Sequence, residues 1–207
     1  DFVITEIGGT VGDIESTPFI EAVRQLKWEL GRNALFVHLT YVPYLKAAKE
    51  LKTKPTQHSV KQLQSMGIQP DILVLRTEKE LPASMRRKVA QFCNVAPEAV
   101  VESLDQPTIY QVPLRMHEQH LDEMIVAMTG ADASPAPDLA AWNTFLRKLS
   151  EAKDHVRIGL VGKYVELQDA YKSISEALMQ AATALDRRLD LVYIHSEKLN
   201  DSNAEEL

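Results

Sequence analysis

The stretch Ile72-Leu73-Val74-Leu75 decides the fold. Four consecutive aliphatic residues are typical of a strand that is buried on both faces, as strands are in parallel sheets. Arg76 follows directly, so a charged side chain marks the carboxyl end of this strand. On either side, short β-branched or aliphatic runs alternate with amphipathic helical patterns. This alternation predicts an α/β fold, a parallel sheet with helices on both faces.

The neighbouring elements follow from hydrophobic periodicity and from helix end signals. Thr17 is expected to cap a helix whose first position is Pro18, and Gly31 ends that helix. The predicted strands are residues 2–5, 34–42, 72–75 and 99–102, and the predicted helices are residues 17–30, 60–66, 82–93 and 117–128.

The composition shifts after this first domain, which we expect at residues 1–130. The run Ala-Asp-Ala-Ser-Pro-Ala-Pro-Asp (131–138) is typical of an interdomain linker, and we assign residues 131–155 to it, with a short helix around residues 139–149. From residue 156 a new strand–helix–strand rhythm begins. A unit of roughly 50 residues has too little core to fold alone. We therefore interpret residues 156–207 as a truncated βαβ stub of a second α/β domain.

Charge and composition exclude several classes of function. The net charge is -6, from 23 basic and 29 acidic residues, which argues against a generic partner for nucleic acid or for anionic membranes. A single cysteine, Cys93, excludes an intramolecular disulfide and favours a reducing, cytoplasmic setting. No apolar stretch approaches the roughly 20 residues that span a bilayer. The chain opens on Asp1 rather than on methionine, so we expect a fragment.

Glu6 is the first residue with a candidate chemical role. It is expected at the carboxyl end of the first strand, before the loop Gly8-Gly9-Thr10-Val11-Gly12, where open α/β sheets place ligand groups. A carboxylate there can hold Mg2+, or it can merely accept hydrogen bonds from loop amides. The loop is not a GxGxxG, and the chain has no GxxxxGK[ST] phosphate cradle.

Asp13 and Glu15 lie two residues apart, so in an extended loop their carboxylates project to the same side. Carboxylates so placed can accept hydrogen bonds from ribose hydroxyls or base amino groups. Alternatively, they favour the start of the following helix electrostatically.

A basic cluster supplies the local positive charge that an anionic ligand would need in this acidic chain. It consists of Lys46, Lys49, Lys52 and Lys54. Hydrogen bonds to charged groups contribute roughly 1.5–3 kcal/mol each, and association costs about 4 kcal/mol or more. Two lysine contacts therefore leave binding weak, no tighter than about millimolar. Other loops or another subunit would have to contribute.

The basic cluster has two possible interpretations, one functional and one structural. It can bind phosphate, or it can be a solvated basic loop. Arg76 and Lys88 are further candidates, although Lys88 alone is typical of a solvated helix residue. Cys93 is expected to be a buried structural thiol and His38 a hydrogen-bonded core residue.

Five runs of sequence together closely resemble the CTP synthase family. They are EIGGTVGDIES (6–16), FVHLTYVPY (36–44), KTKPTQHSV (52–60), GIQPDIL (67–73) and GLVGKYVELQDAYKS (159–173). Apart from residues 131–155 and about the last dozen, this similarity covers nearly the whole chain.

The resemblance implies an ATP-dependent ligase that phosphorylates the 4-oxygen of UTP and replaces the phosphate with ammonia from glutamine. It implies a P-loop, dethiobiotin-synthetase-like fold without its N-terminal P-loop part, followed by the start of a class I glutaminase domain. It also implies a cytoplasmic homotetramer with nucleotide sites between subunits, and GTP as an activator. Nucleic acid and membrane partners are not expected.

By the same resemblance, each candidate residue takes a role. Glu6 would be a Mg2+ ligand, and Asp13, Ile14 and Glu15 would belong to the site of inhibition by CTP. The residues implied to bind both CTP and UTP are Lys52, Thr53, Lys54, Pro55, Thr56, Gln57 and Lys88, and those implied to bind ATP are Arg76, Leu104, Asp105 and Gln106.

Two other interpretations stay open. One is a different amidoligase or carboxylase of the P-loop type, and the other is a non-catalytic CTP/UTP-sensing or assembly module. No catalytic residue is assigned, and we expect the 207-residue chain alone to have neither synthase nor glutaminase activity.

Overall fold

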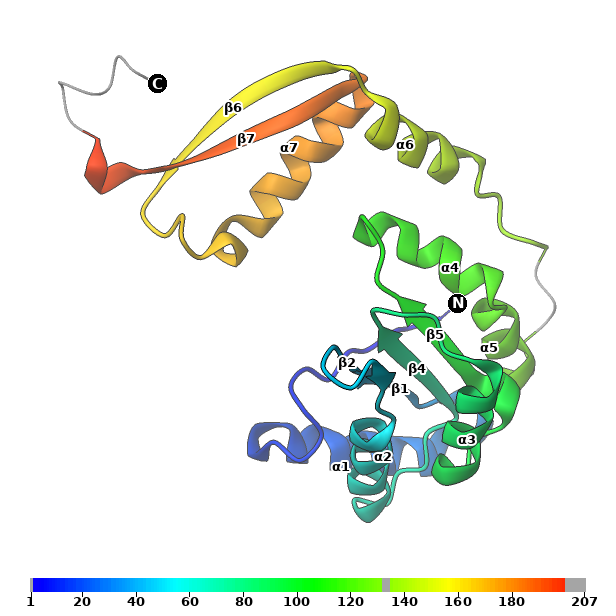
Figure 1. The fold of residues 1–207 in the computed structure, drawn as a ribbon. Helices are drawn as coiled ribbons and strands as arrows, with labels where there is room; N and C mark the ends of the chain where they lie inside the picture. Colours follow the sequence, from blue (N-terminus) through cyan, green and yellow to red (C-terminus); the bar gives the residue numbers. More distant parts are fainter. Residues whose placement is uncertain (1, 132–134, 200–207) are drawn as a thin grey trace. The chain divides into compact units, whose positions relative to one another are not determined.

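The computed structural model describes residues 2–131 and 135–199. These residues form two compact units, one up to Pro135 and one from Ala136 onward. Figure 1 shows the chain coloured along its sequence, with the first unit in blue to green and the second in yellow to red.

A three-stranded parallel sheet organises the first unit. Its strands are Val37–Val42 (β1), Ile72–Thr77 (β4) and Val100–Leu104 (β5), in the order β1-β4-β5. Ile72, Leu73 and Leu75 in the central strand are 0% exposed, and because neighbouring side chains point to opposite faces, both faces of β4 are covered. The predicted α/β fold with a parallel sheet is therefore confirmed.

Helices surround these strands (Figure 1). They are Thr17–Leu30 (α1), Lys54–Ser65 (α2), Ala83–Cys93 (α3), Val112–Glu118 (α4) and Leu121–Thr129 (α5), with short 3-10 turns at Ile14–Ser16, Gly31–Asn33, Pro97–Ala99 and Ile109–Gln111. Apolar side chains of α2 to α5 join the sheet in one core, while Ile20 of α1 and Leu63 of α2 form a smaller cluster with Ile68.

Four local predictions were wrong in detail. Residues 2–5 form no strand: a strand needs a hydrogen-bonded neighbour, and none of the described strands pairs with them. Helix α1 is capped by Ser16 rather than Thr17, which places Pro18 at the second helical position. Helix α2 begins at Lys54, earlier than expected. The helix expected at residues 117–128 is two helices, because His120 adopts a left-handed backbone (φ 60°) between α4 and α5.

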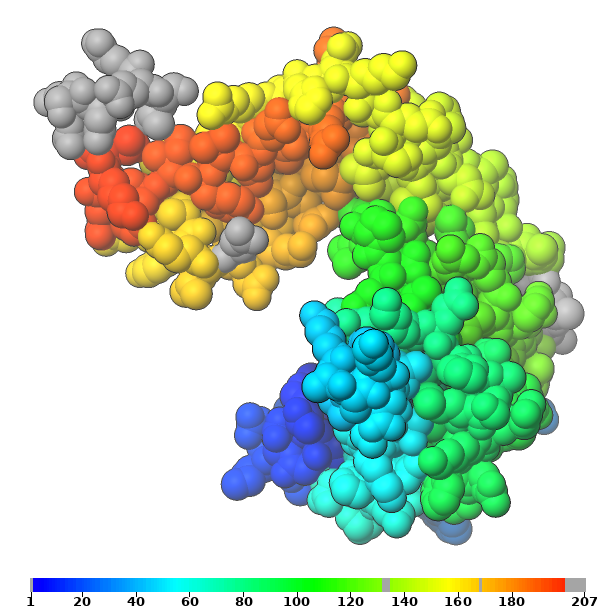
Figure 2. Space-filling view, in the orientation of Figure 1, coloured from blue at the N-terminus to red at the C-terminus, as the bar shows by residue number. Residues whose placement is uncertain are grey.

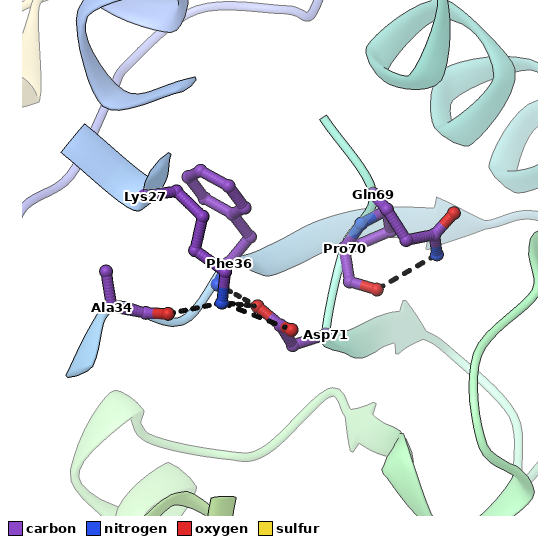
Figure 3. Close-up of polar contacts among 6 residues, drawn as sticks. All are labelled: Lys27, Ala34, Phe36, Gln69, Pro70 and Asp71. Carbon is purple, nitrogen blue, oxygen red and sulfur yellow. Dashed lines mark hydrogen bonds and ion pairs between the residues drawn. The ribbon is translucent and has the colours of Figure 1, made fainter. Parts of the chain in front are cut away.

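A charged contact anchors α1 to the amino edge of the sheet (Figure 3). The Lys27 ammonium lies 3.1 Å from a carboxylate oxygen of Asp71 and also donates to the carbonyl of Ala34. The same carboxylate accepts the backbone N–H of Phe36 at 2.7 Å. The beginnings of β1 and β4 and the last turn of α1 therefore share one carboxylate.

The second unit is a strand–helix–strand motif with one preceding helix. It comprises Ala140–Glu151 (α6), Asp154–Gly162 (β6), Lys172–Ala184 (α7) and Arg187–His195 (β7), with 3-10 turns at Gln168–Tyr171 and Ser196–Lys198. Strands β6 and β7 pair in parallel, as a βαβ motif requires. Helix α6 coincides with the short helix that we expected around residues 139–149, and it packs on α7 and β7.

Within residues 2–131 and 135–199, no helix combines the length and the apolar character needed to cross a membrane.

Candidate functional site

Polar side chains gather where the three strands of the first unit end. The Tyr41 hydroxyl donates to a carboxylate oxygen of Glu78 at 3.0 Å, and the Arg76 guanidinium donates to Asp105 at 3.2 Å. The backbone N–H of Asp105 bonds the carbonyl of Thr77 at 2.9 Å, which ties the loops after β4 and β5 together. Because open α/β sheets bind ligands beyond the carboxyl ends of their strands, we take this edge as the candidate site.

Both charged contacts at this edge are open to solvent. The side chains of Arg76 and Asp105 are 64% and 46% exposed, so their ion pair contributes at most about 1 kcal/mol. The hydrogen bond to Glu78 raises the pKa of Tyr41, because loss of the phenolic proton would break that bond and place two negative charges side by side. At neutral pH Tyr41 is therefore a neutral donor, and Arg76 is a cation that a phosphate could contact.

A second layer of hydrogen bonds fixes the loops behind these side chains. The Glu102 carboxylate accepts the backbone N–H of Leu81, at the entry to α3. The side-chain amide of Gln119 bonds both the N–H and the carbonyl of Glu102, as a neighbouring strand would. Glu102 and Gln119 therefore hold the edge strand β5 and the loop before α3 in one arrangement.

The basic segment between β1 and α2 begins at this same edge. It contains a small hairpin, Tyr44–Leu45 (β2) paired with Glu50–Leu51 (β3), whose turn includes Lys49 with φ 51°. After β3, the backbone N–H of Lys52 bonds the carbonyl of Pro43 at 2.9 Å, and its ammonium lies 2.6 Å from Glu50. The hairpin thus presents Lys52, whose side chain is 42% exposed, next to the carboxyl end of β1. In the space-filling view the segment around the hairpin lies at the surface of the first unit (light blue to cyan in Figure 2).

Three of the predicted pyrimidine-nucleotide residues are buried and support the segment from inside. Thr56 (0% exposed) bonds Thr40 at 3.1 Å and the carbonyl of Tyr41 at 3.3 Å. Gln57 (4% exposed) donates to the hydroxyl of Thr53 at 3.2 Å. These contacts fasten the first turn of α2 against the end of β1, so the exposed Lys54 and Pro55 face solvent beside Lys52.

The remaining predicted nucleotide-binding residues lie on α3 and at the end of β5. Lys88 is exposed on α3, and no ion pair involves it within the described part of the chain. Leu104 ends β5, and the Gln106 side chain donates to the Leu104 carbonyl at 2.9 Å. That bond folds the loop after β5 over itself, next to Asp105.

The structure changes the expectation for Asp13, Ile14 and Glu15. Ile14–Ser16 forms a 3-10 turn rather than an extended loop, so the carboxylates two residues apart do not project together. The Asp13 carboxylate accepts the N–H of Thr10 at 2.7 Å and thereby closes its own loop. Ile14, 88% exposed, and Glu15 face solvent.

Glu6 does not follow a strand, because residues 2–5 form none, and its side chain is exposed. No group of three or more metal-ligating side chains exists among the described residues. Mg2+ keeps several waters and is often held by one or two carboxylates together with substrate phosphates, so a lone glutamate fits such an ion only as part of a shared ligand set.

Two other expectations are confirmed. His38 is 9% exposed and shares a hydrogen bond with Ser59 at 2.9 Å, and its burial lowers the pKa of the imidazole. Cys93 is fully buried, which raises the pKa of its thiol to about 11, so the thiol is inert at neutral pH.

Sequence reasoning did not single out Glu50, Glu78, Glu102 or Gln119. Glu78, Glu102 and Gln119 each bond a residue that is distant in sequence, such as Gln119 with Glu102 of β5, and no local motif marks those pairings. Glu50 did carry one usable signal, since it lies two residues before Lys52 in an extended segment and shares its side of the chain.

Comparison with known proteins gives a consistent family. The family model described as CTP synthase N-terminus matches residues 1–130. The CTP synthase of Porphyromonas gingivalis is 63% identical over 206 residues, which is 100% of this chain and 38% of that protein. The CTP synthase of Bacteroides fragilis is 63% identical over 206 residues (100% and 39%), and that of Flavobacterium johnsoniae is 58% identical over 207 residues (100% and 38%). The chain thus spans well under half the length of these curated relatives, but it aligns with them from end to end, and it belongs to the CTP synthase family.

Proposed function

We propose that this chain forms part of a CTP synthase, which converts UTP, ATP and glutamine-derived ammonia into CTP, ADP and phosphate. In this reaction the 4-oxygen of UTP takes the γ-phosphoryl group of ATP, and ammonia then replaces it as phosphate leaves. The observation that carries the proposal is the basic segment of Lys52 and Lys54 at the carboxyl edge of the parallel sheet. Phosphoryl transfer depends mainly on positioning and on neutralising charge, which is what such a segment supplies.

The proposed residue roles follow from exposure and contacts. Lys52, Lys54 and Lys88 would contact the triphosphate of UTP or of CTP, and Pro55 would line that site. Thr53, Thr56 and Gln57 would act by holding the segment in place, because their side chains are buried. Asp13, Ile14 and Glu15 would contribute to the inhibitory CTP site, and Arg76, Leu104, Asp105 and Gln106 to the ATP site.

A Mg2+ ion, when bound, would neutralise phosphate charge. Glu6 would hold it together with phosphate oxygens of the nucleotides. The Glu6 carboxylate is exposed, and among the described residues it forms no ion pair or hydrogen bond that metal binding would have to break.

We also propose the wider organisation of the enzyme. Residues 1–130 would form the later part of the synthetase domain, residues 131–155 the linker and residues 156–207 the beginning of the glutaminase domain. In the complete enzyme the nucleotide sites would lie between subunits of a homotetramer, since the lysine segment alone offers few contacts, and GTP would activate glutamine hydrolysis. The 207-residue chain contains no GxxxxGK[ST] cradle for ATP phosphates. We therefore expect no CTP formation from ammonia, UTP and ATP by this chain, and detectable turnover would contradict that expectation.

Thermal-shift measurements with UTP, CTP and ATP, each with and without Mg2+, test the proposal. We expect UTP and CTP to raise the melting temperature of the chain, and we expect Lys52→Ala with Lys54→Ala to abolish that rise. The conservative pair Lys52→Arg with Lys54→Arg keeps both charges and serves as the matched control. No response to any nucleotide would overturn the proposed binding site and leave only a scaffold.

A further inference from the structure

The three lysines proposed to contact the triphosphate are not equally available. Lys52 lies 2.6 Å from a carboxylate oxygen of Glu50, whereas no ion pair involves Lys54 or Lys88 anywhere in residues 2–131 and 135–199. The Glu50 carboxylate therefore pairs with only one of the three lysines, Lys52.

The backbone makes this pairing a built feature of the hairpin. Glu50 is in β3, where it pairs with Leu45 of β2, and the ladder continues through the bond from the Lys52 N–H to the Pro43 carbonyl. In extended backbone, residues two positions apart project to the same side. Glu50 and Lys52 are therefore held side by side without a turn or an added loop.

Solvent keeps the pair exchangeable. The side chains of Lys52 and Glu50 are 42% and 48% exposed, and ion pairs of that exposure are weak. A triphosphate carries several negative charges and can therefore displace the single carboxylate, but it then lies close to a like charge.

We propose that Glu50 is an internal anion that pairs with Lys52 in the ligand-free protein and that it sets the affinity of this site for the phosphates of pyrimidine nucleotides. This inference rests on the proposed function and adds a residue that tunes its site. Removal of the Glu50 charge frees Lys52 and removes the repulsion, so binding should become tighter in proportion to ligand charge.

The test is titration calorimetry on the 207-residue chain with cytidine, CMP, CDP and CTP, comparing the unchanged protein with Glu50→Gln. We expect about three- to tenfold tighter CTP binding by Glu50→Gln, a smaller gain for CMP and none for cytidine. The gain should shrink in 0.5 M salt, where charges on the surface are screened. Glu50→Asp keeps the charge and should give a smaller gain, and circular dichroism would verify that each variant is folded.

The matched control is Glu118→Gln. Glu118 also lies in an exposed pair at 2.6 Å, with Arg115 on α4, so the change in net charge is the same. We expect no change in CTP affinity for this variant, and equal tightening by both variants would overturn the proposal.

The remaining outcomes separate this inference from the proposed function. If CTP binds and Lys52→Ala weakens it, but Glu50→Gln does not tighten it, the role of Glu50 is refuted while the nucleotide site stands. If neither CTP nor inorganic tripolyphosphate binds the unchanged protein or Glu50→Gln, both are refuted.

Discussion

Substitution of Asp71 should lower the free energy of unfolding of the first unit more than a comparable substitution of an exposed carboxylate. Asp71→Ala removes the acceptor that the Lys27 ammonium of α1 and the Phe36 N–H before β1 share (Figure 3). Because α1 follows directly on the loop of Asp13 to Glu15, the contact also anchors that loop to the sheet.

The magnitude follows from the two contacts. A hydrogen bond from a backbone N–H to a charged carboxylate, at 2.7 Å here, contributes about 1.5–3 kcal/mol. The ion pair with Lys27, whose side chains are both 28% exposed, is discounted for solvent to about 0.5–1 kcal/mol. Asp71→Ala should therefore cost about 2–4 kcal/mol of the free energy of unfolding. Asp71→Asn keeps an oxygen for Phe36 and should cost about 1 kcal/mol.

Native-state hydrogen exchange of the β4 amides measures this free energy for the first unit alone. The control is Asp105→Ala, which removes an exposed ion pair with Arg76 and should cost at most about 1 kcal/mol. Lys27→Met removes the ion pair but leaves the hydrogen bond from the Phe36 N–H to Asp71, so it measures the contribution of the ion pair separately. If Asp71→Ala destabilises the β4 amides no more than Asp105→Ala does, the shared-carboxylate anchor is refuted.

Three further predictions concern His38, Cys93 and Gly162. Burial lowers the pKa of His38 below 6.5, so as the pH falls the unfolded state takes up this proton before the folded state does. The free energy of unfolding should therefore fall as the pH drops below about 6.5, and His38→Gln should remove part of that fall. An unchanged pH profile in the variant would contradict the role of His38. With its pKa raised to about 11, the Cys93 thiol should react with a disulfide reagent far more slowly in the native protein than in urea, and equal rates would show that it is accessible. A Cβ at Gly162 would clash with the Tyr171 hydroxyl, so Gly162→Ala should lower the free energy of unfolding of the second unit by about 1–3 kcal/mol. The same substitution in a Tyr171→Ala background should cost less. An equal cost in both backgrounds would disprove the clash.

The sequence predicted what depends on local pattern. The aliphatic run before Arg76 identified the central strand, and Gly31 marked the end of α1, because burial on both faces and a helix C-terminus each leave a signature within a few residues. Residues 2–5 have strand-type composition but form no strand, since pairing depends on a neighbour and not on composition.

Contacts between elements account for the rest. No periodicity indicates that His120 breaks a helix or that the Gln119 amide completes the edge of β5. The site shows the same limit. The density of lysines predicted the basic segment, but the burial of Thr56 and the pairing of Lys52 with Glu50 depend on the folded hairpin.

An NMR titration of the 15N-labelled chain with UTP shows directly where the nucleotide binds. We expect the amide shifts to concentrate in residues 43–57, with smaller changes near Arg76 and Lys88, and we expect Lys52→Ala to remove them. Shifts confined to the amino edge around Asp71, or to the second unit, would contradict the claim that the basic segment at the carboxyl edge of the sheet binds the nucleotide.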